Sequence, residues 1–174
     1  MSETEETKPE LTSAEWDVWR TMRSMHEQLA RELDRHLQSD AGISGAEYSV
    51  LQVLTQVPDR RLRTGELAEL LAWEKSRVSH QIARMEARGL LTRTECDTDA
   101  RGVWVGMTPD GRRTWLTATR GHAAMIRKLF FDSVRAEELP ALDALSRRVL
   151  DSLNPAACDL AEEKGMLPRT SRTA

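Results

Sequence analysis

The chain has 174 residues, of which 40% are hydrophobic and 30% charged, and its formal net charge is −3 at pH 7. This length predicts one domain, or one small domain with extensions, and the mildly acidic balance argues against a protein that coats nucleic acid without selection. No stretch approaches the roughly 20 apolar residues of a membrane span and the acidic start lacks a secretory pattern, so we expect a cytoplasmic protein with no membrane partner.

The N-terminal part predicts an acidic leader followed by a long helix. Residues 1–10 are acidic and lack periodicity, which is typical of a disordered segment. The helix should begin at the capping box Thr12-Ser-Ala-Glu15. Its apolar residues then recur at helical spacing for about seven turns, longer than an average globular helix: Trp16, Trp19, Met22, Leu29, Leu33 and Leu37. Such a helix needs a partner along most of its length.

Two shorter helices are predicted next. The capping box Ser44-Gly-Ala-Glu47 begins the first of them, and Pro58 stops it. A short basic loop, residues 59–63, leads to Thr64, which we expect to cap the next helix. The apolar residues of the two helices are Val50, Leu51, Val53, Leu54 and Val57 in the first and Leu67, Leu70 and Leu71 in the second.

A fourth helix and a two-stranded ribbon follow the turn Ala72-Trp73-Glu74. The helix should run from Lys75 to Arg88 and end at Gly89, because glycine suits the left-handed position after a helix. Residues 91–96 and 103–108 then read as strands joined by a polar turn at residues 97–102.

The remaining elements are two more helices. Thr108-Pro109 is typical of a helix start, with a capping hydroxyl and proline in the first helical position. A sixth helix carries Leu142, Leu145, Val149, Leu150 and Leu153 and closes at Asn154-Pro155, and residues 155–174 are expected to form a C-terminal tail. The predicted fold is therefore mainly α with a small β-wing, a winged helix-turn-helix of element order αααα-ββ-αα.

The fourth helix has two different sides. Val78, Ile82 and Met85 share one face, which leaves a set of polar and basic residues facing elsewhere: Lys75, Ser76, Arg77, Ser79, His80 and Arg84. Short polar, basic and imidazole groups suit the edges of bases in a major groove. The alternative is an ordinary solvated helix face, and charge alone does not exclude it.

Three stretches resemble the MarR family of transcriptional regulators. Glu66-Leu-Ala-Glu-Leu-Leu followed by Ser76-Arg-Val-Ser-His resembles the family's "ELAxxL…SxVSR" helix-turn-helix. Met85-Glu-Ala-Arg-Gly-Leu-Leu-Thr-Arg is similar to its "LExxGLVxR" passage into the wing. Asp99-Ala-Arg101 and Val105-Gly-Met-Thr-Pro-Asp-Gly111 are similar to its "DxR" wing tip and "VxLTxxG" exit. The resemblance spans about residues 12–153.

The resemblance implies a homodimer that binds double-stranded DNA. Residues 11–58 and 109–154 would form the helical dimerisation region and residues 59–108 the winged helix-turn-helix DNA-binding region. The fourth helix would enter the major groove and the wing the minor groove of a pseudo-palindromic operator, and the family's usual role is repression. The chain departs from the family pattern at His80, where arginine is frequent, and at Trp73-Glu74, where a small aliphatic residue and Ser or Asp are usual.

The candidate contact residues differ in what they can recognise. Arg77 can pair with both acceptors of guanine, and the alternative is a phosphate contact or a solvated side chain. Ser76, Ser79 and His80 can reach bases or phosphates, whereas Lys75 and Arg84 suit phosphates.

The wing tip carries a separate candidate pair. By the resemblance, Arg101 would enter the minor groove and Asp99 would orient it through an ion pair. The alternative is a local turn pair with no role in DNA binding.

Trp16 and Trp19 have two interpretations. They could line a pocket for a small-molecule effector of unknown identity between the dimerisation and DNA-binding regions, as the resemblance implies. Their position at the helix start and at stripe spacing favours a place in the dimer core.

Other functions find little support. His26, Glu32 and His36 lack a fourth convergent ligand, so no metal or cofactor is predicted. Cys96 and Cys158 are too few for a disulfide framework, and the acidic neighbours of Cys96 disfavour a reactive thiolate. No nucleophile–base pair or phosphate loop indicates an enzyme. The remaining alternative is a winged-helix module for protein or RNA contact without duplex DNA specificity.

Overall fold

The computed structural model describes residues 10–96 and 99–166, without the side chains of residues 96–102. The elements are, in chain order, α1 (Ser13–Ala41), α2 (Gly45–Gln56), β1 (Arg61–Arg63), α3 (Thr64–Leu71), α4 (Lys75–Ala87), β2 (Leu91–Cys96), β3 (Asp99–Met107), α5 (Pro109–Leu129), two 3₁₀ turns η1 (Phe131–Ser133) and η2 (Ala136–Glu138), α6 (Leu139–Leu153) and α7 (Pro155–Glu163). The mainly helical fold with a small antiparallel sheet is confirmed. The leader prediction falls on residues 1–9, which lie outside the described residues.

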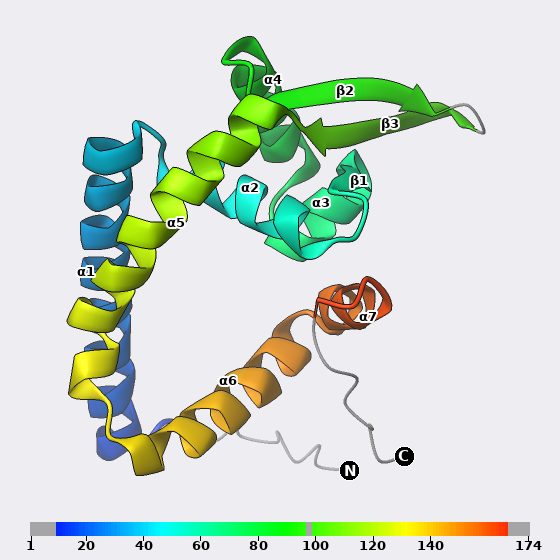
Figure 1. Ribbon diagram of the computed structural model, residues 1–174. Coiled ribbons are helices and arrows are strands. Elements are labelled where there is room, and N and C mark those ends of the chain that lie inside the picture. Colours follow the sequence, from blue (N-terminus) through cyan, green and yellow to red (C-terminus); the bar gives the residue numbers. More distant parts are fainter. Residues whose placement is uncertain (1–9, 97–98, 167–174) are drawn as a thin grey trace, which may run out of the picture.

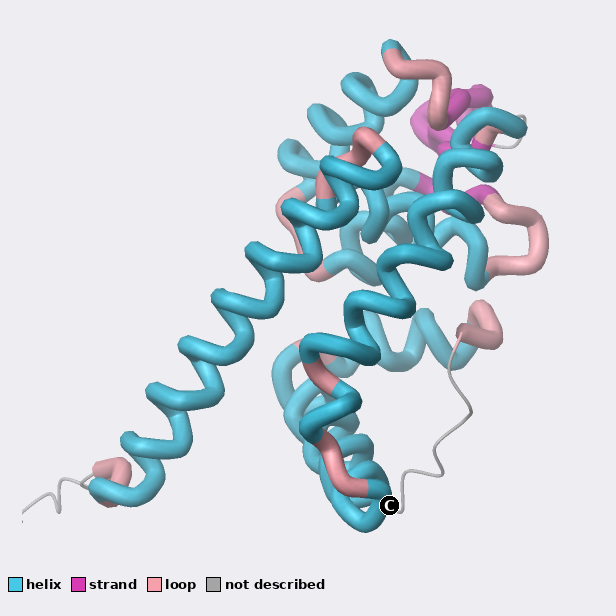
Figure 2. The backbone as a smooth tube through the Cα atoms, turned by 60° about the vertical axis from the view of Figure 1, so that its left-hand side comes forward, coloured by secondary structure: helices cyan, strands magenta, loops and turns pink. Residues whose placement is uncertain are grey.

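The helices form an open arrangement around the winged helix (Figure 1). Helices α1 and α5 contact each other, and α2, α3, α4 and the sheet gather at one end of this pair. Helix α6 starts at the other end and runs back toward the winged helix, where α7 contacts α3. The N-terminal turns of α1 project away from the other helices (Figure 2). None of the helices in the described ranges has the length and apolar composition needed to cross a bilayer.

Local sequence signals set most helix ends. The Thr12 and Ser44 hydroxyls accept bonds from the backbone N–H groups of Glu15 and Glu47, at 3.3 and 3.2 Å, so both predicted capping boxes are confirmed. The predicted cap at Thr64 is wrong by one residue. Arg63 occupies the N-cap and its N–H donates to Glu66 Oε2 at 2.8 Å, because strand pairing already holds Arg63 extended.

The sheet has a third strand that the sequence did not predict. Its order is β1-β3-β2, with all pairs antiparallel, and Leu62 of β1 lies opposite Val105 of β3. Both side chains are fully buried. Residues 59–63 were predicted as a loop because three residues are too few to display a strand period.

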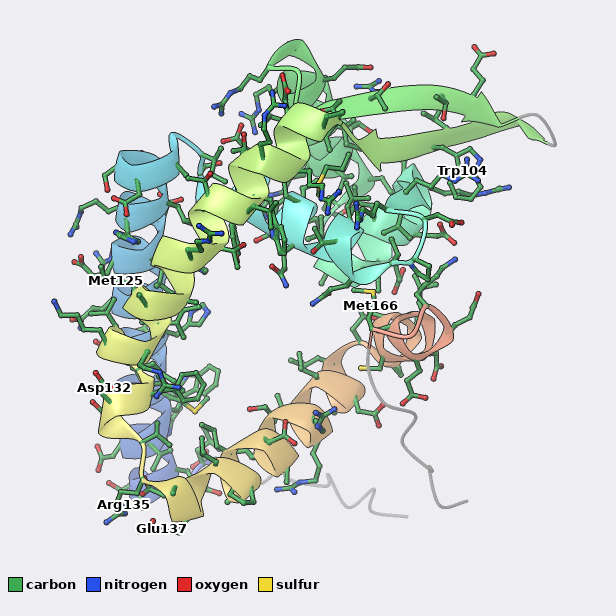
Figure 3. All side chains as sticks on the ribbon, viewed as in Figure 1. Trp104, Met125, Asp132, Arg135, Glu137 and Met166 are labelled. Atoms are coloured by element: carbon green, nitrogen blue, oxygen red, sulfur yellow. The ribbon has the colours of Figure 1, made fainter. Side chains whose placement is uncertain are left out.

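The C-terminal tail prediction missed α7. Asn154 Oδ1 accepts the N–H of Ala157 at 3.2 Å and Pro155 occupies the first turn, so the pair that ends α6 also begins α7. Ala161 is buried, and Met166 packs against the core on the side of α7 that faces the winged helix (Figure 3). Proline is compatible with a first helical turn as well as with a stop.

The hydrophobic core belongs mainly to the winged helix. Its fully buried large side chains lie on the C-terminal end of α1, on α2, α3 and α4, and on the sheet: Leu37, Ile43, Val50, Leu51, Leu54, Leu62, Leu67, Val78, Ile82, Met85 and Val105. In contrast, α6 has no buried residue, and Leu153 is 76% exposed. One chain therefore leaves the apolar stripe of α6 uncovered.

An ion pair fixes the end of α4 to the start of α2. Glu47 is buried, and its carboxylate pairs with the Arg88 guanidinium. A second Arg88 nitrogen donates to the carbonyl oxygen of Gly42 at 2.8 Å. Arg88 thus connects the α1–α2 turn with the end of the helix that carries the candidate contact residues.

We expect Arg88→Ala to lower the free energy of unfolding by about 1–3 kcal/mol, because it leaves a buried carboxylate without its cation. Urea unfolding at one protein concentration measures this loss. Arg113→Ala is the matched control, since Arg113 pairs with Asp110 in an exposed position. That variant should change stability by less than about 0.5 kcal/mol. Equal values for the two variants would contradict the assigned role of Arg88.

Candidate nucleic-acid interface

Helix α4 presents the predicted polar face to solvent. Val78, Ile82 and Met85 are buried against the core. The candidate contact side chains are all exposed: Lys75, Ser76, Arg77, Ser79, His80 and Arg84. The helix begins without a side-chain cap at Glu74, as the poor capping ability of glutamate predicts. Its end is sharp, since Gly89 has φ 73° and the N–H of Leu90 donates to Met85 O at 2.9 Å.

Three of these side chains already have partners in the free chain. Ser79 Oγ donates to the carbonyl oxygen of Lys75 at 2.9 Å. Arg84 donates to the side-chain oxygen of the buried Gln81, which anchors its guanidinium near the middle of the helix. The guanidinium carbon of Arg77 lies 4.1 Å from the ring centroid of Trp73. Trp73 is one of the departures from the family pattern, and its residue type alone did not predict a contact with Arg77.

The wing is the β2–β3 ribbon, and its tip carries Asp99 and Arg101. The backbones of both residues lie in β3, where Asp99 pairs with Cys96. Their side chains lie outside the described residues, so the predicted ion pair and minor-groove contact stay predictions.

The outer side of the sheet carries a basic and aromatic cluster. The guanidinium carbons of Arg61 and Arg63 lie 5.0 and 5.4 Å from the ring centroid of Trp104, which Figure 3 shows beside β1. Sequence reasoning missed this cluster because β1 was not predicted. Once β1 is paired with β3, the alternation of Arg61, Leu62 and Arg63 places both arginines on the face of Trp104.

Helix α7 contacts α3, which is the first helix of the helix-turn-helix. Lys164 Nζ lies 2.7 Å from Glu66 Oε1. Burial opposes ionisation of Glu66, but hydrogen bonds from Lys164 and from the Arg63 N–H hold the pKa of its carboxyl below the ordinary value. Glu66 therefore stays charged at neutral pH and ties α7 to the N-terminus of α3.

Trp16 and Trp19 lie at the end of α1 that is remote from the winged helix (Figure 1). They are 46% and 52% exposed, so a single chain does not enclose them. This exposure fits the dimer-core interpretation. The effector-pocket interpretation stays a prediction.

Glu32 and His36, which were weighed as metal ligands from the sequence, each lie beside another charged side chain of α1. Glu32 pairs with Arg35 at 2.6 Å, and His36 Nε2 lies 3.1 Å from Asp40 Oδ2. Burial, with a contribution from the charge of His36, lowers the pKa of His122 on the neighbouring helix α5. Within the described residues, His, Cys, Asp and Glu do not gather in groups of three or more that could hold an ion.

The sequence and the fold were both compared with those of known proteins. The MarR family model matches residues 41–102. The fold is similar to Sco3205 from Streptomyces coelicolor, a MarR family transcriptional regulator solved in complex with DNA, with TM-score 0.82 and 35% identity over 89% of this chain and 97% of that one. It is also similar to AbsC, a MarR family regulator from the same organism, with TM-score 0.79 and 32% identity over 84% and 98%.

A more distant likeness concerns the fold alone. A mutant MarR from E. coli complexed with operator DNA has TM-score 0.70 and 20% identity over 82% of this chain and 99% of that one. No curated protein matches the sequence.

Proposed function

The chain belongs to the MarR family of transcriptional regulators, and we propose that it represses transcription by binding a pseudo-palindromic DNA operator as a homodimer. The observation that carries the proposal is the outward face of α4. Its polar and basic side chains are exposed next to a wing, while Val78, Ile82 and Met85 fix the opposite face in the core. Sco3205, which is similar in fold over 89% of the present chain, was solved in complex with DNA.

The side chains of α4 divide by the contacts that they can make. Arg77 suits the O6 and N7 acceptors of guanine, and Ser76, Ser79 and His80 suit base edges or phosphates. Arg84, held by Gln81, and Lys75 suit phosphates that flank the major groove. These groups bind and orient DNA, and the proposed role requires no catalysis.

The dimer is supported by apolar surface that one chain leaves uncovered. The exposed large hydrophobic residues concentrate on α1 and on the C-terminal part of the chain: Trp16, Val18, Trp19, Met22 and Met25 on α1, and Leu139, Leu145, Val149, Leu150 and Leu153 on α6. Contiguous exposed apolar surface of this kind marks an interface. A second copy covers equivalent faces by two-fold symmetry.

Selection of bound duplexes from a random pool tests the proposal. We expect an enriched dyad whose half-sites lie about one helical turn apart, and protection of that dyad in a footprint upstream of a regulated gene. Affinity should fall steeply with added salt. Failure to enrich any dyad, or stronger binding to RNA than to duplex DNA, would favour the alternative of a protein- or RNA-contact module.

We expect Arg101→Ala to weaken operator binding by about 1–3 kcal/mol and to remove the preference for A·T pairs at the position of the wing, because narrow A·T tracts concentrate the negative potential that attracts arginine. Titrations at matched salt with A·T-rich and G·C-rich flanks measure both effects. Arg113→Ala on α5 removes an exposed arginine far from the wing tip and serves as the control. An unchanged dissociation constant for Arg101→Ala would show that the wing tip does not contribute.

A further inference from the structure

The turn between α3 and α4 places the indole of Trp73 next to Arg77, a candidate for contact with DNA bases. Ala72 adopts a left-handed conformation with φ 51°, and the N–H of Trp73 donates to Ala68 O at 3.0 Å. The indole is half-buried and packs against the hydrophobic core. The ring is therefore fixed by α3 and the core before α4 begins.

Arg77 lies one helical turn after Trp73, and its guanidinium rests on that ring. The distance from Arg77 Cζ to the ring centroid is 4.1 Å, shorter than the 5.0 and 5.4 Å of the two arginines beside Trp104. Trp is the best ring for a cation–π contact, and arginine is the cation that stacks on it most often. The contact holds a long, exposed side chain in one region of space.

A stacked guanidinium keeps its edge free. Contact through the flat face leaves the N–H groups in the plane of the guanidinium available, and two of them match the O6 and N7 acceptors of guanine. A side chain that is already oriented loses less conformational freedom when it binds. In Arg84, by contrast, one guanidinium N–H already donates to the side-chain oxygen of Gln81. Lys75 carries a compact charge at the end of a flexible side chain and lacks the planar pair of donors.

We propose that Trp73 is a positioning residue that sets the base preference of Arg77, by holding the guanidinium over the N-terminal turn of α4 with its donor edge toward a guanine. The proposal rests on the proposed DNA-binding function and adds a specificity determinant that lies outside the contact face itself. It predicts that Trp73 affects base preference through Arg77 alone, and at the base pair that Arg77 contacts.

The test measures base preference with the full chain and a selected operator. Each base pair of one half-site is replaced in turn, and binding at fixed salt is compared for the wild type, Arg77→Ala, Trp73→Leu, Trp73→Phe and the double variant of Arg77→Ala with Trp73→Leu. We expect Arg77→Ala to lose preference at one G·C pair. Trp73→Leu should reduce preference at the same pair by about fivefold, the size of an exposed cation–π contact, and Trp73→Phe should retain most of it. In the Arg77→Ala background, Trp73→Leu should change nothing further at that pair.

Two controls separate positioning from packing. Trp104→Leu removes the indole beside Arg61 and Arg63. Whatever its effect on overall affinity, it should leave the base preference at the pair that Arg77 contacts unchanged. Thermal unfolding reports any loss of stability, and the double-variant comparison cancels a general effect of that kind because it is present in both backgrounds.

The outcomes are distinct. Equal weakening of all duplexes by Trp73→Leu, or additive effects of Trp73→Leu and Arg77→Ala, would mean that Trp73 only packs, and would overturn the proposal. If Arg77→Ala changes the preference at none of the base pairs, the proposal for Trp73 is also overturned. An enriched dyad would in that case still support DNA binding by the chain. Failure of the wild type to enrich any dyad would overturn the proposed function together with this inference.

Discussion

Gly111→Ala should lower the free energy of unfolding by about 3 kcal/mol or more, the upper part of the range for overpacked sites. A Cβ atom at position 111 would lie 2.1 Å from the carbonyl oxygen of Leu90 and 3.1 Å from Met107 Cγ. The Leu90 oxygen is a backbone atom that accepts the N–H of Thr108 at 3.2 Å, so a shift that relieves the contact has to move the main chain and disturb this hydrogen bond.

The contact between Gly111 and Leu90 also joins α5 to the segment that follows α4. Gly111 is buried in the first turn of α5, and its N–H donates to the Thr108 hydroxyl at 2.9 Å. Leu90 follows the end of α4. A shift that relieves the contact must therefore separate α5 from the end of α4, and we expect weaker DNA binding together with the loss of stability.

Gly65→Ala is the matched control, because Gly65 lies in α3 and a Cβ atom there meets nothing within 4 Å. Alanine has the higher helix propensity, so this variant should be neutral or more stable by up to about 1 kcal/mol. Denaturant unfolding of both variants at one protein concentration gives the comparison. If Gly111→Ala unfolds at the same denaturant concentration as Gly65→Ala, the close approach of α5 to Leu90 is not a constraint.

Local signals in the sequence predicted the parts of the fold that local chemistry decides. The capping boxes at Thr12 and Ser44, the left-handed Gly89 and the Thr108-Pro109 start each need only a few neighbouring residues, and each appears as predicted. Strand β1 depends instead on pairing with β3, more than 40 residues later in the chain. A three-residue strand carries too little period to be recognised without its partner.

The candidate site shows the same division. Helical periodicity was enough to predict which side of α4 is exposed, because 3.6 residues per turn fix the face opposite Val78 and Met85. The contact of Arg77 with Trp73 depends on the left-handed Ala72, which turns the chain between α3 and α4. Alanine rarely adopts that conformation, so residue type gave no indication of it. Helix α7 was missed because proline was read as a stop, and its contact with Glu66 joins segments about 100 residues apart.

Val149→Asp should convert the proposed homodimer into a monomer and weaken operator binding by about 100-fold or more, because a monomer loses the gain from holding two half-sites at once. Val149 is 48% exposed and lies on the apolar stripe of α6, a helix that buries no side chain within its own chain. A carboxylate on that stripe would have to leave water when a second copy covers it, and the neighbouring stripe residues Leu142, Leu145 and Leu153 have apolar side chains that cannot compensate its charge.

Ala144→Asp adds the same charge to the same helix on the side away from the stripe, where helical spacing places Ala144 about half a turn from Val149. It should leave the mass in solution and the operator affinity close to those of the wild type. Sedimentation equilibrium measures the mass, and titration of one selected operator measures the affinity. Because α6 contributes nothing to the buried core of one chain, Val149→Asp should keep the helical content of the wild type, which circular dichroism reports. A dimeric Val149→Asp with full affinity would exclude α6 from the interface and favour α1, where Trp16 and Trp19 are exposed, as the surface that a second copy covers.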